Sequence, residues 1–445
     1  MSSDSKSPGR RRAIAAAAIG NAFEWYDFSV FVLFAPFIAQ AFFPEDDGTT
    51  GMIKALLTFA VGFIARPVGA VLIGYFGDRA GRKAALTLTF GLMALGTAII
   101  ALAPTHAMIG AAAPVIVLFG RLLQGLSAGG EIGGAAAFLI EHAPPTRRAR
   151  IGAWLQASMA MSNILAALVA ISAGQIFDAQ AMASYGWRIP FLFGLLIVPI
   201  GIWLRATLDE TPAFEAVAAQ APERRPRIGQ LLAGHGEALL RGFGISVLWG
   251  VAIYALVVFM PVHLQRALGY SANEALLASL AGNAVLAGTC FVSGALADRF
   301  GRRALMGAAA IALAIGAPLL MAALAEARSL LLLVPIQMLF CALVGLYSGA
   351  APAILAELFP TAIRSTGTSI SYNAAITLFA GFAPAIITWL AANGFGAQAP
   401  TGYVAAAAVV GLIAIRGLPR RTRQAGEPGP AAEPTVIVLD PVRQR

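Results

Sequence analysis

Five ionisable side chains lie inside long apolar runs of this sequence, namely Glu24, Asp27, Arg66, Arg121 and Glu131. A charged side chain at the centre of a bilayer costs about 2.5–3.5 kcal/mol or more, so each of these is a functional candidate by default. An arginine keeps its charge when buried, whereas a carboxylate that has lost its water can take up a proton. Such a pair of groups can couple the binding of an anion to the movement of a proton.

The spacing of these residues places several of them on one helix face, and the chemistry of their side chains suggests their roles. Arg121, Gln124, Ser127 and Glu131 follow steps of three, three and four, which places them on one side of a helix. We expect the arginines to bind an anion and the carboxylates Glu24, Asp27 and Glu131 to carry protons. The expected substrate-binding residues are Arg121, Arg66, Gln124, Asn21, Gln156, Tyr372 and Asn373. Further neutral candidates for the lining are Ser158, Asn163, Trp249, Tyr254, Asn283, Gln337, Tyr347, Ser369, Ser371 and Thr377.

A structural alternative exists for every residue named above. The buried charges could pair only with each other to hold the helices together, and Arg66 with Asp27 would be one such pair. The neutral side chains could serve as hydrogen bonds between helices, which is their common use in membranes.

The composition requires a membrane protein. Apolar residues make up 58% of the chain and charged residues 12%, against about 25% charged in a soluble domain. The apolar residues form runs of 18 or more, enough to cross the hydrocarbon as a helix. Basic residues occupy the gaps between these runs, which argues against nucleic-acid binding. Cys290 and Cys341 lie within apolar runs, so we expect no disulfide, metal or cofactor, and no motif of an enzyme nucleophile is present.

Twelve apolar runs predict an all-α polytopic membrane protein with twelve transmembrane helices in two six-helix bundles. The predicted helices are 13–43, 52–76, 84–104, 108–141, 149–177, 187–206, 239–264, 274–297, 303–325, 329–357, 365–392 and 401–417. The division into domains follows from them: an N-terminal bundle at 1–206, a polar linker at 207–238, a C-terminal bundle at 239–417 and a disordered tail at 418–445.

Two short motifs occur once in each predicted bundle. The turn GYFGDRAGRK at 74–83 returns as GALADRFGRR at 294–303, and Glu141 before a proline is matched by Glu357. An aspartate in such a turn can cap a helix or pair with an arginine across the bundle. We therefore predict a gate that closes the cytoplasmic side. Its residues are Gly74, Asp78, Arg79, Gly81, Arg82, Asp298, Arg299, Arg302, Glu141 and Glu357.

The distribution of positive charge predicts the orientation. With the N-terminus in the cytoplasm, 25 lysine and arginine residues fall on the inner side and 4 on the outer side. Such an excess is the positive-inside signal of a cytoplasmic-membrane protein, here with both termini inside.

The paired turns resemble those of the major facilitator superfamily. Five further strings are similar to the metabolite:proton symporter family: GNAFEWYDF (20–28), RPVG (66–69), RLLQGLSAGGE (121–131), GWRIPF (186–191) and LDETPAF (208–214). Residues 110–121 and 346–360 look most like the citrate and tricarballylate members. The resemblance implies the major facilitator fold and proton-coupled uptake of a small metabolite by alternating access.

We therefore expect a symporter, not an enzyme, for a small organic acid such as citrate or 2-oxoglutarate. A zwitterionic osmolyte such as proline or betaine, or an aromatic acid, is the alternative substrate, and export is the alternative direction. A sensor would need a signalling domain, which the tail of 28 residues cannot supply. We expect a monomer in the bilayer.

Overall fold

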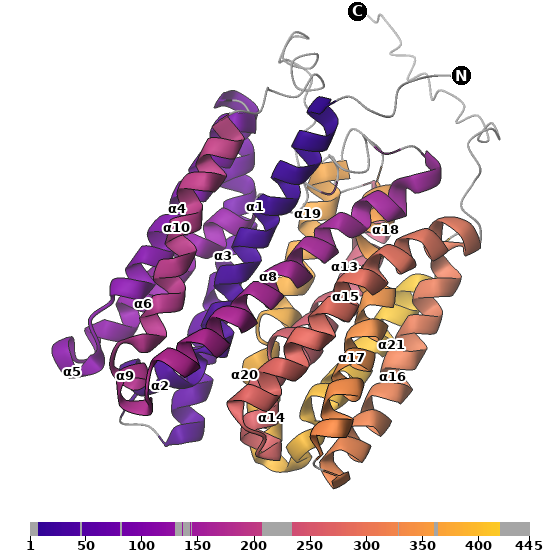
Figure 1. Cartoon of the computed structure of the whole chain (residues 1–445). Coiled ribbons are helices and arrows are strands. Elements are labelled where there is room, and N and C mark those ends of the chain that lie inside the picture. Colours follow the sequence, from indigo (N-terminus) through magenta and orange to yellow (C-terminus); the bar gives the residue numbers. More distant parts are fainter. Residues whose placement is uncertain are drawn as a thin grey trace, which may run out of the picture.

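The computed structural model of the chain describes residues 8–44, 47–80, 82–129, 136, 143, 145–206, 234–327, 329–359 and 364–418. Every regular element in these ranges is helical. Figure 1 shows the helices in two bundles of roughly parallel rods, with the elements up to α10 in one bundle and those from α13 onward in the other. We call these the first half and the second half.

The first half contains the elements that precede the central gap at residues 207–233. They are α1 (Pro8–Leu33), α2 (Ala35–Phe42), α3 (Gly48–Ala80), α4 (Arg82–Leu102), α5 (His106–Ile109), α6 (Ala112–Gly129), η1 (Pro145–Arg147), α8 (Arg148–Ile176), α9 (Ala179–Ser184), η2 (Gly186–Arg188) and α10 (Ile189–Ala206).

The second half follows the gap. Its elements are α13 (Gly236–Ile253), η4 (Tyr254–Val258), α14 (Met260–Leu268), α15 (Ala272–Phe300), α16 (Arg302–Ala327), α17 (Leu330–Ser348), α18 (Ala351–Glu357), α19 (Arg364–Ala375), η6 (Ile376–Ala380), α20 (Ala383–Leu390), η7 (Ala391–Phe395), η8 (Gly396–Gln398) and α21 (Ala399–Arg416).

Several predicted helices are interrupted. The run 13–43 was expected as one helix, but α1 and α2 meet at a bend of 62°, next to a proline at the start of α2, which cannot donate a backbone hydrogen bond. The run that was predicted to begin at 108 starts as the short α5 and breaks at Gly110, where φ is 62°. The seventh and eleventh runs contain the π-helical turns η4 and η6. The linker predicted to reach residue 238 ends sooner, because α13 begins at Gly236.

The described helices are suited to a membrane. Eight of them are long and apolar enough to cross it, or nine if the bent pair of α1 and α2 is one span. One of the eight, Thr366–Arg416, has 51 residues, more than twice the ~20 that one crossing needs. The apolar helices Thr87–Leu102 and Gly186–Leu196 are shorter and are not among the eight. The predicted number of twelve is not tested by this count.

Glycine lets three helices of the first half touch through their backbones. A methyl group on Gly125 of α6 would lie 1.7 Å from the carbonyl oxygen of Gly62 in α3. A methyl group on Gly96 of α4 would lie 2.6 Å from the carbonyl oxygen of Gly120 in α6. Small residues permit this close approach between membrane helices. As a result, α6 is held tightly between α3 and α4, and the polar side chains of α6 occupy fixed positions.

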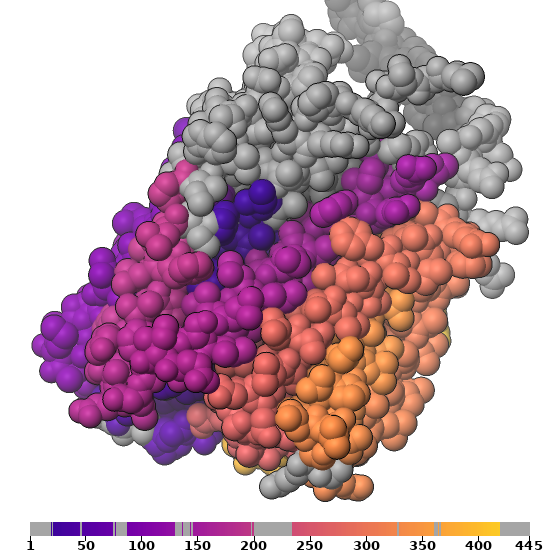
Figure 2. Space-filling model, in the orientation of Figure 1, coloured from indigo at the N-terminus to yellow at the C-terminus, as the bar shows by residue number. Residues whose placement is uncertain are grey.

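The two halves meet along α8 and α15. These helices run side by side across the face shown in Figure 1, and in Figure 2 their side chains form a continuous contact. The rings of Trp154 in α8 and Phe291 in α15 are 4.9 Å apart between centroids. Deeper in the contact, Asn163 of α8 donates a hydrogen bond of 3.0 Å to Asn283 of α15. A second contact joins α3 to the second half, where Thr377 of η6 donates to the carbonyl oxygen of Phe63 at 2.8 Å.

Candidate functional site

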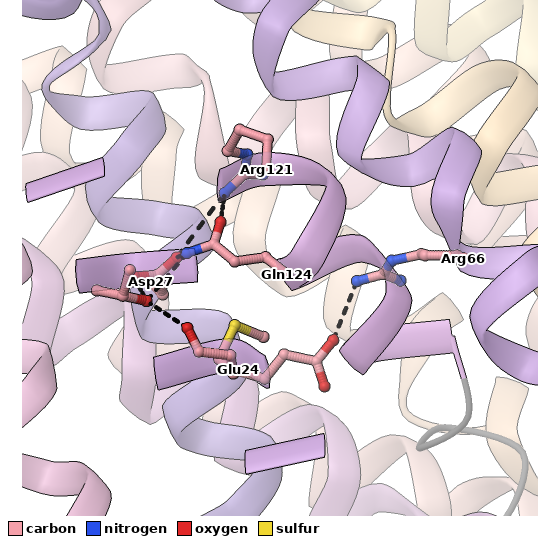
Figure 3. Close-up of polar contacts among 7 residues, drawn as sticks. Glu24, Asp27, Arg66, Arg121 and Gln124 are labelled. Carbon is pink, nitrogen blue, oxygen red and sulfur yellow. Dashed lines mark hydrogen bonds and ion pairs between the residues drawn. The ribbon is translucent and has the colours of Figure 1, made fainter. Parts of the chain in front are cut away.

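Arg66 and Glu24 form a buried ion pair between α3 and α1. Nη2 of Arg66 lies 3.0 Å from Oε1 of Glu24, and the exposed fractions of the two side chains are 0% and 3%. Figure 3 shows the two side chains pointing toward one another. Because a buried charge without its partner is costly, the loss of either charge would destabilise the first half.

Asp27 is held by three polar side chains from α4 and α6. Oδ1 of Asp27 accepts a hydrogen bond of 2.8 Å from the hydroxyl of Thr97, and Oδ2 accepts one from the amide of Gln124. Arg121 donates from Nη1 to the amide oxygen of Gln124, and this Nη1 lies 3.8 Å from Oδ2 of Asp27. Gln124 therefore bridges the guanidinium and the carboxylate, as Figure 3 shows.

Aromatic rings enclose both guanidinium groups. The Cζ of Arg121 lies 4.6 to 4.8 Å from three ring centroids, those of Phe28, Phe31 and Phe59. The Cζ of Arg66 lies 5.0 Å from the centroid of Phe28 and 4.6 Å from that of Phe63. A cation over an aromatic face gains about 2 kcal/mol or more when both are removed from water. The rings thus help to keep two positive charges inside an apolar bundle.

Each guanidinium keeps hydrogen-bond donors that have no partner among the described residues. These are Nε and Nη1 of Arg66 and Nε and Nη2 of Arg121, all of them buried. An unsatisfied buried donor costs about 1–3 kcal/mol, and more when it is charged. A ligand that brings carboxylate oxygens to these atoms would recover that free energy.

The second half contributes two tyrosines to this region. The ring of Tyr254, in the π-helical turn η4, lies 5.5 Å from Phe63 and 5.7 Å from Trp25. Tyr372 of α19 lies 4.9 Å from Trp249. Both tyrosines are within electrostatic range of Arg66 and Glu24. The hydroxyl of Tyr254 is buried and has no hydrogen-bond partner in the described part of the chain. Charged groups of the first half therefore face polar groups of the second.

The other predicted binding residues are buried but do not all join this cluster. The amide of Asn21 donates to the carbonyl oxygen of Leu155 at 3.0 Å and to Ser158 at 2.9 Å, so it links α1 to α8. Asn373 donates to the carbonyl oxygen of Gly129 at 3.2 Å and thereby joins the two halves. The amide nitrogen of Gln156 and the amide oxygen of Asn373 have no partner among the residues with described side chains.

The charge pairing differs from the structural alternative considered for the sequence. Arg66 pairs with Glu24 and not with Asp27, and Asp27 lies with Arg121 instead. The sequence did not single out Thr97, whose hydroxyl contacts Asp27 directly. A threonine in an apolar helix is common, and only its neighbour Gly96, which lets α6 approach, could have drawn attention to it.

A second charged cluster lies where α8, α15, α16 and α18 meet. Arg302 forms ion pairs with Asp298, at 3.6 Å, and with Glu357, and Arg148 lies 3.7 Å from Glu357. The predicted gate residues Asp298, Arg302 and Glu357 are therefore in contact, with Arg148 as a member that the sequence analysis did not assign. Arg299 lies apart, with its Cζ 5.1 Å from the ring of Phe300.

Several predicted residues cannot be placed. Glu131, Glu141 and Gly81 lie outside the described residues. The backbones of Gly74, Asp78, Arg79 and Arg82 belong to α3 and α4, but the positions of their side chains are outside the description.

Comparisons with known proteins identify the family. Residues 13–225 match the family described as "Sugar (and other) transporter", and residues 276–443 match "Major Facilitator Superfamily". The citrate-proton symporter of Klebsiella pneumoniae is 35% identical over 414 residues, covering 92% of each chain. The chain belongs to the major facilitator superfamily. The proline/betaine transporter of Salmonella typhimurium is 34% identical over 418 residues, covering 91% of this chain and 82% of that one.

The fold of this transporter agrees with its family. The inward-open, partially occluded xylose transporter XylE from E. coli superposes with a TM-score of 0.74 at 18% identity, covering 93% of this chain and 98% of that one. The predicted major facilitator fold and the predicted place among metabolite:proton symporters are confirmed. The protein is thus a multi-pass membrane transporter and not an enzyme.

Proposed function

We propose that this transporter takes up a small organic anion, a di- or tricarboxylate such as citrate or 2-oxoglutarate, together with protons. The observation that carries the proposal is the pair of buried arginines, each with one carboxylate partner and each with unused donors. The citrate-proton symporter among its relatives supports the same class of substrate.

The charges of the cluster supply the coupling. With Glu24, Asp27, Arg66 and Arg121 all ionised, the four buried side chains carry no net charge. A proton on either carboxylate leaves its arginine without a counter-charge, which is costly in a site of low dielectric constant. A carboxylate of the substrate can then take that place. Substrate binding and protonation therefore favour one another, which is the requirement for symport.

The number of arginines favours a substrate with at least two carboxylates. Arg66 and Arg121 each offer two donors to the oxygens of a ligand. Nε and Nη2 of Arg121 share one edge of the guanidinium and suit two parallel hydrogen bonds to a carboxylate, whereas Nε and Nη1 of Arg66 lie on different edges. The hydroxyl of Tyr254, which faces the same region from the second half, is available for a further polar group such as a third carboxylate or a hydroxyl.

A zwitterion such as proline or betaine is the second candidate, supported by the proline/betaine transporter among the relatives. A quaternary ammonium group is usually bound by aromatic faces. Here the faces of Phe28, Phe31, Phe59 and Phe63 are already covered by guanidinium groups. The pairs Trp25–Tyr254 and Trp249–Tyr372 remain for such a ligand, or for the ring of an aromatic acid. The presence of two arginines in the site favours an anionic substrate over a zwitterion.

We further propose that the protein lies in the cytoplasmic membrane with both termini inside, and that residues 1–206 and 239–417 rock about the central site as a monomer. The excess of lysine and arginine on the predicted inner side supports this orientation. The cluster of Asp298, Arg302 and Glu357 would close the inner end.

The test is uptake by the purified protein in proteoliposomes. Radiolabelled citrate, succinate, 2-oxoglutarate, proline and betaine are offered with and without an inward proton gradient. We expect a carboxylate to accumulate only with the gradient. Accumulation of proline or betaine alone would assign the second function, and uptake that ignores the gradient would remove proton coupling.

A further inference from the structure

A small cavity lies inside the first half, against both buried carboxylates. Its volume is about 30 Å³, and its lining includes Glu24 and Asp27 of α1, Thr97 of α4 and Ser127 of α6. A cavity needs about 10–15 Å³ for one water, so this one has room for about two. Leu195 and Val198 of α10 close its other side. All of the lining residues belong to the first half, so the cavity is separate from the contact between the halves.

The cavity leads away from Asp27 in one direction. Along α4 it extends from Thr97 back to Phe90, a distance of about 10 Å at 1.5 Å per residue. Along α1 it extends from Asp27 back to Phe23. Both helices begin on the same side of the bundle, the side predicted to be cytoplasmic. The cavity therefore extends from the Asp27 carboxylate toward the side predicted to be cytoplasmic and ends at Phe90, eight residues after the start of α4.

Thr97 can serve both protonation states of Asp27. Its hydroxyl lies 2.8 Å from Oδ1 of Asp27 and 3.0 Å from the carbonyl oxygen of Met93. A hydroxyl has one proton, so it can donate to only one of these acceptors at a time. With Asp27 ionised, the proton of Thr97 points to the carboxylate. With Asp27 protonated, the same hydroxyl accepts from the acid and donates to Met93.

Among the described residues, few charged or titratable groups lie near Asp27. On its own helix they are Glu24, which is paired with Arg66, and Tyr26, which donates to the carbonyl oxygen of Pro190 at 2.9 Å. From α6, Arg121 approaches Asp27 to 3.8 Å. The residues by which α4 and α10 line the cavity carry no charge. Burial, the charge of Arg121 and the hydrogen bonds of Thr97 and Gln124 together determine the protonation of Asp27.

From this arrangement we propose that the cavity and Thr97 form a proton route between Asp27 and the cytoplasm that is separate from the substrate path. A water in the cavity takes the proton from the Asp27 O–H, which becomes a carboxylate, and carries it as hydronium along the cavity toward the cytoplasmic side. The hydroxyl of Thr97 turns from Met93 to the new carboxylate. In the reverse direction the same bonds break and form in the opposite order. This inference rests on the proposed proton symport.

The first test removes the hydroxyl of Thr97 while keeping its shape. In Thr97→Val, both forms of Asp27 lose a hydrogen bond, but the bond to the ionised carboxylate is the stronger of the two. We therefore expect the pH profile of substrate uptake to shift upward by at least half a pH unit. Thr97→Ser retains the hydroxyl and should restore the profile of the unaltered protein. An unchanged profile in Thr97→Val, or a shift that Ser does not rescue, would overturn the role of Thr97.

The second test fills the cavity. Leu195→Phe adds a ring at its wall, whereas the matched control Leu196→Phe adds the same ring at a side chain that is 71% exposed. Exchange of labelled for unlabelled substrate at equal pH on both sides requires no net proton release. We expect Leu195→Phe to slow uptake driven by a proton gradient at least five-fold. The rate of exchange in the same variant should change less than two-fold. Leu196→Phe should change neither rate.

Equal loss of both activities in Leu195→Phe, or no loss of either, would overturn the proton route. Failure of the proposed symport gives a different result, because the unaltered protein itself would then take up substrate without responding to the proton gradient.

Discussion

The carboxylate of Asp298 accepts a hydrogen bond of 3.2 Å from the backbone nitrogen of Ala149, across the boundary between the two halves. The backbone nitrogen of Arg150 donates to the other carboxylate oxygen, also at 3.2 Å. Asp298 lies in the last turn of α15 and Ala149 in the first turn of α8, so a carboxylate of the second half caps a helix of the first. The positive end of a helix dipole favours such a charge. This contact and the ion pairs of Arg302 hold the predicted cytoplasmic end together.

Loss of this cap is predicted to open that end. Asparagine removes the negative charge and one of the two acceptor oxygens, a loss of about 1 kcal/mol, or roughly a five-fold change in an equilibrium. A cysteine that replaces Ala149 reports this opening, because position 149 is fully buried in the closed structure. We expect Asp298→Asn to raise its rate of alkylation about five-fold in membranes. The native Cys290 and Cys341 are both buried and give little background.

The control for this experiment is Glu274→Gln. Glu274 belongs to the capping box at the other end of α15, so its replacement perturbs the same helix without touching the contact between the halves. A comparable rise in alkylation in this control, or no rise with Asp298→Asn, would contradict the role of Asp298.

Arg121→Gln is predicted to abolish substrate transport without loss of folded protein. Glutamine removes the charge that faces Asp27 and the donors left for a ligand. We also expect Arg121→Lys to fail, because lysine lacks the planar fork that binds a carboxylate through two hydrogen bonds. Uptake and gel-filtration profile are measured together. Arg188→Gln, which alters an arginine stacked on Trp187, serves as the control and should transport. Normal uptake by Arg121→Gln would refute the assignment.

Glu24→Gln is predicted to make substrate binding less dependent on pH. In the unaltered protein a proton must neutralise a carboxylate before its arginine can bind substrate, so affinity should fall as the pH rises. Glutamine resembles the protonated acid and leaves Arg66 without its charged partner. The prediction is tested by measuring the affinity for substrate at several pH values by calorimetry. An equally steep pH dependence in the variant would exclude Glu24 as a coupling group.

Tyr254→Phe is predicted to weaken substrate binding without reducing stability. The hydroxyl of Tyr254 has no partner within the described residues, so none of their hydrogen bonds is lost with it. A hydrogen bond contributes about 0.5–1.5 kcal/mol, which corresponds to roughly a two- to ten-fold loss of affinity. Tyr347→Phe is the matched control, because the hydroxyl of Tyr347 donates to the carbonyl oxygen of Ile245. That change should lower the melting temperature and leave affinity unchanged.

Gly125→Ala is predicted to destabilise the first half severely. The added methyl group would lie 1.7 Å from the carbonyl oxygen of Gly62, and forcing an extra methyl into a packed core costs about 1–3 kcal/mol or more. The same substitution at Gly91 meets no atom within 4 Å and should be tolerated. The two variants are compared by their melting temperatures in detergent. Equal melting temperatures would show that α3 and α6 do not pack through their backbones.

The sequence by itself determined that this is a multi-pass helical transporter, because runs of apolar residues long enough to span a bilayer leave few other folds possible. It also marked Glu24, Asp27, Arg66 and Arg121, because a charge inside such a run is rarely accidental. The bend at Pro36 was not foreseen, since neighbouring helices decide whether a proline interrupts a membrane helix. The π-helical turn at Tyr254 was not foreseen either.

Only the tertiary structure decided which charges meet. Sequence spacing places residues on a face of one helix, but the rotation of that helix against its neighbours determines the partner. Backbone contact at Gly96 and Gly125 sets this rotation for α6, and it brings Gln124 between Arg121 and Asp27 and against Thr97. Glu24 pairs with Arg66 instead. Pairing across helices depends on distances of a few ångströms, and such distances arise only when the helices pack.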